Sequence, residues 1–198
     1  QQCQKFGDVI IIDDCSTDRS GPIIKQKRNI FYYKNKKNLG YDKSINRGFG
    51  IVLKKKYDYV ITVDGDGQHG INQIKKIIYL KKFNYDCICS IRNKFSNFYE
   101  IILSYITYKK FKLNDILCGL KAYKISSCRK VKNSNIFINN NIGLFYFMNL
   151  LIRKNFKIKK VKIKIQSRKY FTSRFYKNFL SKIIILSLIS KVIFLQTR

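Results

Sequence analysis

Two carboxylates and an amide follow a hydrophobic run in the stretch DYVITVDGDGQH, residues 58–69. Asp64, Asp66 and Gln68 stand at alternating positions, with a glycine between each pair. Two carboxylates in this spacing, with an amide oxygen beside them, can hold one divalent cation that bridges a diphosphate. A tight polar turn would explain the same residues without a ligand. An EF-hand loop does not fit, because its sixth position, a glycine in that motif, is His69 here.

A second acidic cluster lies in IIIDDCSTD, residues 10–18. Asp13 and Asp14 directly follow a run of isoleucines that is typical of a buried strand. Two adjacent carboxylates in such a place are costly unless they bind or cap something. The Ser, Thr and Asp side chains that follow them could cap a helix. Capping would explain one or two of these residues but not the whole run, so a ligand is the other explanation.

Alternating strand and helix patterns must position these two clusters. Strands are predicted over residues 9–12, 30–33, 59–63 and 87–90, and helices over 41–56 and 71–82. This order predicts a mainly parallel α/β sheet with helices on both faces. Such sheets bind ligands at the carboxyl ends of their strands, where both acidic clusters stand. Farther along we expect a helix over 95–108, a loop and short strand over 114–123, a helix over 141–154 and an edge strand over 161–165.

The composition fits a folded, strongly basic protein. The chain has 198 residues and is 45% hydrophobic, enough for one domain with a core. Lys and Arg number 41 against 11 Asp and Glu, for a net charge of +30. Such a surface attracts the phosphates of nucleic acid, anionic lipid or nucleotide, although a codon bias toward lysine would also raise the charge. The spacing of the six cysteines and the single histidine argue against zinc, and we expect free thiols.

The C-terminal segment, residues 175–195, contains the run KIIILSLISKVIFL. Its uninterrupted apolar stretch is shorter than the roughly 18–20 residues that span a bilayer. A helix in the membrane interface, with Lys182 and Lys191 reaching the head groups, fits the pattern, and a helix packed on the domain is the alternative. We therefore expect a domain over residues 1–174 and an interfacial helix over 175–198. The protein would then be cytoplasmic and peripheral at the inner face of a membrane.

Together these motifs resemble family-2 glycosyltransferases of the GT-A fold, over roughly residues 8–175. The subgroup they resemble most is the polyprenyl-phosphate glycosyltransferases, with dolichyl-phosphate mannosyltransferase as the familiar member. Besides the acidic clusters, four segments are similar to motifs of that family: NLGYDKSINRGF at 38–49, CSIRN at 89–93, DILCGLKAY at 115–123 and RKYFTSR at 168–174. In the third, Cys118 and Leu120 replace Ser and Phe, and in the fourth, Phe171 replaces Gly.

The resemblance implies a nucleotide-sugar site with a metal. The residues that match its nucleoside-binding positions are Ile12 and Asp14. Those that match the D-x-D holding the sugar nucleotide and its metal are Asp64, Gly65 and Asp66. Asp66 and Gln68 match the ligands of the metal, Mg²⁺ or Mn²⁺.

The resemblance also implies basic and acidic residues around the reacting groups. Arg92, Arg168 and Arg174 match residues that hold phosphates of the donor or acceptor, a task that suits guanidinium forks. Asp115 matches a carboxylate near the acceptor and is an acid/base candidate. The catalytic set implied in this way is Asp66, Asp115 and Arg168.

The implied reaction is an inverting, metal-dependent transfer of a sugar from a nucleotide-sugar to a polyprenyl phosphate. A phosphate acceptor is already ionised, so a strong general base is less necessary. One alternative acceptor is a sugar hydroxyl of a polysaccharide or cell-surface glycan. Another alternative is a non-catalytic basic module for anionic lipid or nucleic acid, although the acidic clusters would repel phosphates unless a cation is bound. Because the family begins with a strand and a nucleobase-gripping motif, and only residues 1–7 precede the first predicted strand, we expect an incomplete N-terminal part.

Overall fold

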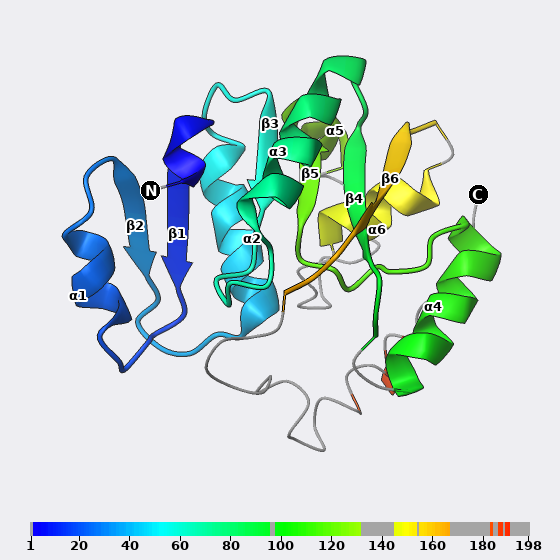
Figure 1. Cartoon of the computed structure of the whole chain (residues 1–198), viewed down its shortest axis with the longest axis horizontal. Helices are drawn as coiled ribbons and strands as arrows, with labels where there is room; N and C mark the ends of the chain where they lie inside the picture. Colours follow the sequence, from blue (N-terminus) through cyan, green and yellow to red (C-terminus); the bar gives the residue numbers. More distant parts are fainter. Residues whose placement is uncertain are drawn as a thin grey trace. The chain divides into compact units, whose positions relative to one another are not determined.

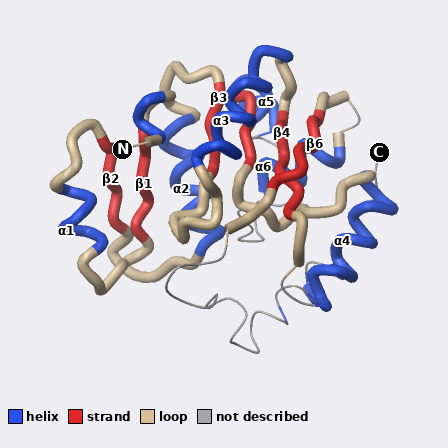
Figure 2. Tube along the Cα trace, in the orientation of Figure 1, coloured by secondary structure: helices blue, strands red, loops and turns tan. Residues whose placement is uncertain are grey.

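The computed structural model of the chain is a mixed α/β structure, drawn in Figures 1 and 2. It describes residues 2–95, 98–131, 145–153, 155–166, 183, 186–187 and 189–190. The chain forms two compact units, one of Gln1–Val60 with Lys124–Asn149 and one of Ile61–Tyr123 with Leu150–Arg198. The predicted fold class is thereby confirmed, and each unit is described by itself below.

The first unit is built around two parallel strands, β1 (Val9–Asp13) and β2 (Ile30–Lys34). Their β-branched and aromatic residues favour strand geometry, and Ile10 lies opposite Phe31 in the register. A short 3₁₀ turn, η1 (Cys3–Lys5), precedes them. The helices of this unit are α1 (Ser20–Lys25), α2 (Tyr41–Val52), α5 (Ile125–Val131) and the first part of α6 (Phe145–Ile152), which ends in the second unit. The helix α2 packs against β1 and α1 against β2.

Contacts distant in sequence hold the first unit together. The ring of Phe49 in α2 stacks on that of Tyr146, with 4.2 Å between the centroids. The guanidinium of Arg129 in α5 donates to the backbone oxygens of Leu53 and Lys55 just beyond α2. The segment that begins at residue 124 therefore closes over the helix that follows β2.

A second sheet has four strands in the order β3 (Tyr59–Thr62), β5 (Lys121–Lys124), β4 (Cys87–Arg92) and β6 (Ile158–Ile163). The pair β4–β6 is parallel and the pair β4–β5 antiparallel. Residues 87–89 of β4 are completely buried, as a central strand requires. The connections include α3 (Ile71–Leu80), the 3₁₀ turn η2 (Lys81–Phe83) and α4 (Phe98–Phe111).

Most predicted elements are confirmed, with shifted ends. The helix predicted over 41–56 ends at Val52, and the edge strand predicted over 161–165 is β6, which begins three residues earlier and does lie at a sheet edge. The sequence patterns missed α1 and α5. The helix predicted over 141–154 is found as α6, although residues 141–144 lie outside the described part of the chain.

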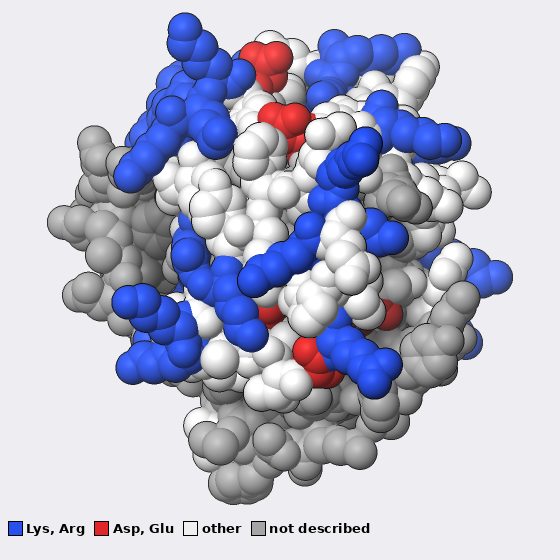
Figure 3. Space-filling view, turned by 90° about the vertical axis from the view of Figure 1, so that its left-hand side faces the viewer, with Lys and Arg blue, Asp and Glu red and all other residues white. Residues whose placement is uncertain are grey.

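The predicted C-terminal helix, residues 175–198, lies mostly outside the described residues. Among the residues that are described, no helix has the length and apolar character needed to cross a membrane. All six cysteines are free, as predicted. Lys and Arg side chains are spread over the face drawn in Figure 3 and far outnumber Asp and Glu there.

Candidate functional site

The loop that follows β3 is anchored where the strand ends. The hydroxyl of Thr62 donates to the backbone oxygen of Gly119 at 2.7 Å. Beyond it, Asp66 Oδ1 accepts a hydrogen bond of 3.0 Å from the backbone nitrogen of Gln68, and Gly67 takes a φ of +76° that favours glycine. Residues 64–68, called the Asp64–Gln68 loop below, therefore form a tight turn with carboxylates on a fixed backbone.

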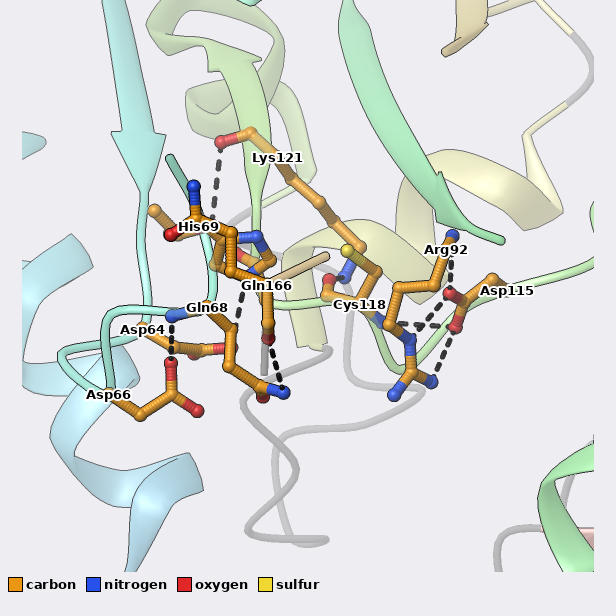
Figure 4. A network of polar contacts seen from close by, with 11 residues as sticks. Asp64, Asp66, Gln68, His69, Arg92, Asp115, Cys118, Lys121 and Gln166 are labelled. Carbon is orange, nitrogen blue, oxygen red and sulfur yellow. Dashed lines mark hydrogen bonds and ion pairs between the residues drawn. The ribbon is translucent and has the colours of Figure 1, made fainter. Parts of the chain in front are cut away.

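The Asp64 carboxylate is confined on two sides, as Figure 4 shows in part. Its Oδ2 lies 3.3 Å from Nε2 of His69, whose side chain is only 3% exposed. On another side lies Gly119, where an added Cβ would overlap both carboxylate oxygens. The other ring nitrogen of His69, Nδ1, is buried and has no hydrogen-bond partner among the described residues. Asp64 itself stays 29% exposed, so a fixed carboxylate reaches the surface here.

A segment from far along the chain lies beside the Asp64–Gln68 loop. The backbone nitrogen of Gln166 donates to Gln68 O at 3.0 Å, and the amide nitrogen of Gln68 reaches back to Gln166 O at 3.5 Å. Gln73 of α3 donates to Lys164 O at 3.1 Å. Gln166 precedes the predicted phosphate-binding Arg168 by two residues, and both Arg168 and Arg174 lie outside the described residues.

A buried ion cluster lies at the end of β4. Arg92 Nε donates to Asp115 Oδ2 at 2.8 Å and Arg92 Nη2 to Oδ1 at 2.9 Å, in the two-pronged geometry drawn in Figure 4. Glu100 of α4 lies 3.5 Å from the same guanidinium. The Asp115 and Glu100 side chains are each 1% exposed. One guanidinium therefore serves two buried carboxylates.

Every lone-pair direction of the Asp115 carboxylate is used inside the protein. Besides the two guanidinium bonds, Oδ2 accepts from the backbone nitrogen of Arg92 at 3.0 Å and Oδ1 from that of Cys118 at 3.2 Å. An ionised carboxylate offers about four acceptor sites, so four donors saturate it. This geometry gives Asp115 and Arg92 a structural function; the acid/base role of Asp115 and the phosphate-binding role of Arg92 stay predictions.

The segment 115–119 joins these two clusters. Its first residue, Asp115, is held by Arg92, and its last, Gly119, lies against Asp64. Next to it, Lys121 is 2% exposed, and its ammonium donates to the backbone oxygen of Cys118. A shift of this segment would therefore displace the Asp64 carboxylate.

Sequence reasoning missed the supporting residues of this site. They are His69, Glu100, Gly119 and Lys121. His69 is the single histidine of the sequence and stands directly after Gln68, which was the one visible signal. The roles of the others depend on contacts between segments that no local pattern contains.

The other acidic cluster lies in the first unit, where Asp14 holds the loop that leads into α2. Its carboxylate accepts hydrogen bonds of 2.8 Å from the backbone nitrogens of Leu39 and Gly40 and from the Asn35 side chain. Burial raises the pKa of Asp14, but these hydrogen bonds outweigh it and hold the pKa below its ordinary value of 3.8. Asn35 also donates to Ser44 of α2 at 3.0 Å. Asp14 therefore shapes the loop at this strand end.

The neighbouring Asp13 is buried and similarly occupied. It accepts a hydrogen bond from the Tyr32 hydroxyl, which raises the pKa of Tyr32 to about 12, and one of 2.7 Å from Ser16 N. Ile12, the other predicted nucleoside contact, lies on β1 with its side chain 3.6 Å from where a Cβ would stand at Gly48. Donor binding by Ile12 and Asp14 stays a prediction.

The donor atoms of the Asp64–Gln68 loop suit a hard divalent cation that a substrate helps to hold. Asp66 and Gln68 offer a carboxylate and an amide oxygen on one turn, and Mg²⁺ prefers such ligands together with substrate phosphates. Within the part of the chain that the structure describes, no group of three His, Cys, Asp or Glu side chains is placed to hold a metal by itself. The oxygen donors of Asp66 and Gln68 therefore fit a divalent cation that a bound diphosphate also coordinates.

Comparison of the sequence with protein families gives one match that covers most of the chain. A family model described as glycosyl transferase family 2 matches residues 2–169. Two uncharacterized proteins of Methanocaldococcus jannaschii are similar. The first is 31% identical over 145 residues, covering 63% of each chain. The second is 25% identical over 186 residues, covering 85% of this chain and 74% of the relative. The chain thus spans 63% of the length of the first relative.

Solved structures with the same fold include enzymes. Glucosyl-3-phosphoglycerate synthase from Mycobacterium tuberculosis, in complex with Mn²⁺, uridine diphosphate and glucosyl-3-phosphoglycerate, superposes with a TM-score of 0.68 at 13% identity, covering 96% of this chain and 71% of that one. S. aureus TarS gives a TM-score of 0.56 at 18% identity, covering 98% and 59%. At these identities the likeness concerns the fold alone.

Proposed function

The chain belongs to glycosyl transferase family 2, and we propose that it transfers a sugar from a nucleotide-sugar to a phosphate-bearing acceptor, foremost a polyprenyl phosphate. The observation that carries this proposal is the Asp64–Gln68 loop, a carboxylate turn fixed by Gly119, His69 and Gln166. A site that binds a diphosphate and a metal together needs carboxylates held in this way before the ligand arrives.

The donor side of the site is supported by the charges and by the neighbour with the same fold. That neighbour binds Mn²⁺ and uridine diphosphate together. In this chain, Asp66 and Gln68 would hold Mg²⁺ or Mn²⁺, and Asp64 would orient the sugar nucleotide. When bound, the metal would compensate for the negative charge of the diphosphate leaving group. Arg168 and Arg174, in the segment that begins after Gln166, would hold phosphate oxygens, and Ile12 and Asp14 the nucleoside.

The acceptor proposal rests on the saturated state of Asp115. A sugar hydroxyl must lose a proton as it attacks, so a hydroxyl acceptor needs a general base with an open lone pair, and Asp115 is the candidate that the resemblance implies. All four acceptor directions of Asp115 are used by Arg92 and Cys118. A phosphate oxygen attacks already ionised and needs no base. The geometry therefore favours a phosphate acceptor over the hydroxyl of a polysaccharide.

The reaction would proceed by a single displacement at the anomeric carbon. The acceptor phosphate oxygen forms the new bond on one face of the sugar while the bond to the diphosphate breaks on the other, so the configuration inverts. The nucleoside diphosphate leaves with both electrons of that bond, and no proton changes hands. The chain's own contribution is to orient the donor through the loop and to keep the segment 115–119 in place.

The decisive experiment measures donor binding with and without Mn²⁺. We expect Asp66→Asn to abolish the metal-dependent part of nucleotide-sugar binding in calorimetry with a panel of uridine and guanosine diphosphate sugars. Asp58→Asn, which changes an exposed carboxylate just before β3, is the matched control and should bind as the unaltered chain does. Metal-dependent binding that survives Asp66→Asn would overturn the proposed donor site.

Product analysis then separates the acceptors. Transfer of labelled sugar to a short-chain polyprenyl phosphate, but not to oligosaccharides, supports the phosphate acceptor. The reverse preference would point to a glycan acceptor and to a base other than Asp115. Absence of metal-dependent nucleotide binding, together with salt-sensitive RNA binding, would favour a non-catalytic basic module, which the +30 charge alone would also suggest.

A further inference from the structure

The helix α4, at the right of Figure 1, has large hydrophobic side chains that are exposed to water. Phe98, Ile101, Tyr105 and Tyr108 are 44–69% exposed. Their spacing of three, four and three residues places them in one stripe along the helix. We call these four residues the α4 stripe. Contiguous apolar surface of this kind on a folded domain marks a site of interaction.

Packing among the residues that the structure describes does not explain the α4 stripe. The other face of the helix already supplies the buried side, with Leu103, Ser104 and Thr107 buried and Glu100 beside Arg92. An ordinary surface helix would be polar opposite that face. This helix instead buries mostly polar side chains and exposes large apolar ones, so packing among the described residues does not account for the exposed side.

Lysines accompany the tyrosines of the stripe. Lys109 Nζ lies 5.5 Å from the ring centre of Tyr105, and Lys112 Nζ lies 5.6 Å from that of Tyr108. Cations near a helix C-terminus also complement its dipole, which alone would account for their presence but not for the aromatic stripe beside them. Tyrosine and lysine combine an apolar body with a polar tip, as side chains at a membrane–water boundary do.

We propose that the α4 stripe is a membrane-contact surface that lies in the head-group region of an anionic bilayer. The charge of +30 makes an anionic partner favourable and a second copy of the chain unfavourable. An aliphatic residue, Ile101, lies within the stripe, and the rings stand on the exposed side of a single helix. Single-stranded nucleic acid is usually bound by stacking in a basic groove, so the bilayer fits this surface better.

This inference rests on the proposed function in one respect. Contact of the α4 stripe with a membrane would bring the protein close to the lipid phosphate that we propose as its acceptor. It is nevertheless tested without any donor, so the two proposals fail separately. Binding to vesicles reports on the α4 stripe alone. Nucleotide-sugar binding in solution reports on the Asp64–Gln68 loop alone.

The test compares flotation of the whole chain with two kinds of vesicle, pure phosphatidylcholine and phosphatidylcholine with about 30% phosphatidylglycerol, at about 0.15 M salt. The variant Ile101→Ser with Tyr105→Ser should lower the partition into anionic vesicles about tenfold or more. Ile23→Ser with Tyr79→Ser is the matched control, since these residues are 54% and 61% exposed against 53% and 62%. The control should bind as the unaltered chain does. Circular dichroism checks that both variants fold.

A second pair of variants separates insertion from charge. Lys109→Gln with Lys112→Gln should reduce the preference for anionic over neutral vesicles more than Lys54→Gln with Lys56→Gln, which removes the same charge from another exposed stretch. Several results would overturn the proposal. One is an equal loss of vesicle binding in the stripe and control variants, and another is unchanged flotation after Ile101→Ser with Tyr105→Ser. A third is a dimer, seen by light scattering, that dissociates in this variant. The fourth is RNA that binds the stripe and thereby displaces the chain from vesicles.

Discussion

Replacing Gly119 with Ala places a methyl group where the Asp64 carboxylate now stands. The new Cβ would overlap both oxygens and the carboxyl carbon. All three distances would be under 3.0 Å, and real Cβ atoms essentially never come that close to another atom. Ordinary contact begins at 3.4 Å, so the carboxylate must shift by about 1 Å. Disturbing the residues that orient a metal site typically costs about 10–100-fold in metal affinity. We therefore expect Gly119→Ala to weaken metal-dependent nucleotide-sugar binding about 10–100-fold, or about 1.4–2.8 kcal/mol.

The same substitution should leave the fold intact. The overlapped atoms are the end of a partly exposed side chain, which can swing away without moving the backbone. We expect the free energy of unfolding in urea to change by less than about 1 kcal/mol. Gly50→Ala is the control, because nothing lies within 4 Å of a Cβ at Gly50, in α2. It should keep donor affinity and stabilise the helix by about 0.5–1 kcal/mol.

A double-mutant cycle makes the reasoning refutable. In an Asp64→Ala background the overlapped atoms are gone, so adding Gly119→Ala should change neither stability nor residual binding. Unchanged donor affinity in Gly119→Ala alone would show that Asp64 need not be fixed. An equal loss of binding in the presence and absence of Asp64 would show that Gly119 acts on something else.

Three further outcomes follow from the contacts described. Arg92→Met leaves the buried carboxylates of Asp115 and Glu100 unpaired, so urea unfolding should show a loss of about 3–5 kcal/mol, and a loss below about 1 kcal/mol would contradict the cluster. The pKa of Asp14 is lowered in the folded state, so its contribution to the free energy of unfolding is present above the unfolded pKa and disappears as the pH falls below about 4. In Asp14→Asn the free energy of unfolding should therefore depend less on pH in that range, as urea unfolding at each pH would measure. Burial raises the pKa of three thiols to about 11 or 12, so iodoacetamide at about pH 8 should modify them only after unfolding, and mass spectrometry of the native protein should find them unmodified. These thiols are Cys89, Cys118 and Cys128.

Local patterns predicted the elements whose signals are contained within one segment. The isoleucine run of β1 and the i, i+4, i+7 spacing of α2 are such signals, and both elements appear where expected. The patterns missed α1 because it has only six residues and contains Gly21 and Pro22, a pair that usually indicates a turn. Pro22 is tolerated there because it lies in the first turn of the helix.

The site was predicted only where its chemistry is local. The turn of Asp64, Asp66 and Gln68 lies within five residues, so its spacing was informative. The resemblance predicted that Arg92 binds a phosphate, and that stays a prediction; the pairing of its guanidinium with Asp115, 23 residues away, and with Glu100 was not predicted. A single sequence contains nothing that distinguishes an arginine paired within the protein from one facing a ligand, since the difference depends on which segments meet.

The bond between Gln166 and Gln68 has a consequence for biosynthesis. The two residues are 98 positions apart, and the pairing of β4 with β6 also joins distant parts of the chain. Such contacts form late, because the entropy of closing a long loop must be overcome before they stabilise anything. A nascent chain still on the ribosome would carry the Asp64–Gln68 loop without the segment that holds it. Nucleotide binding would then begin only after the segment that contains Gln166 has been synthesised and has reached the loop.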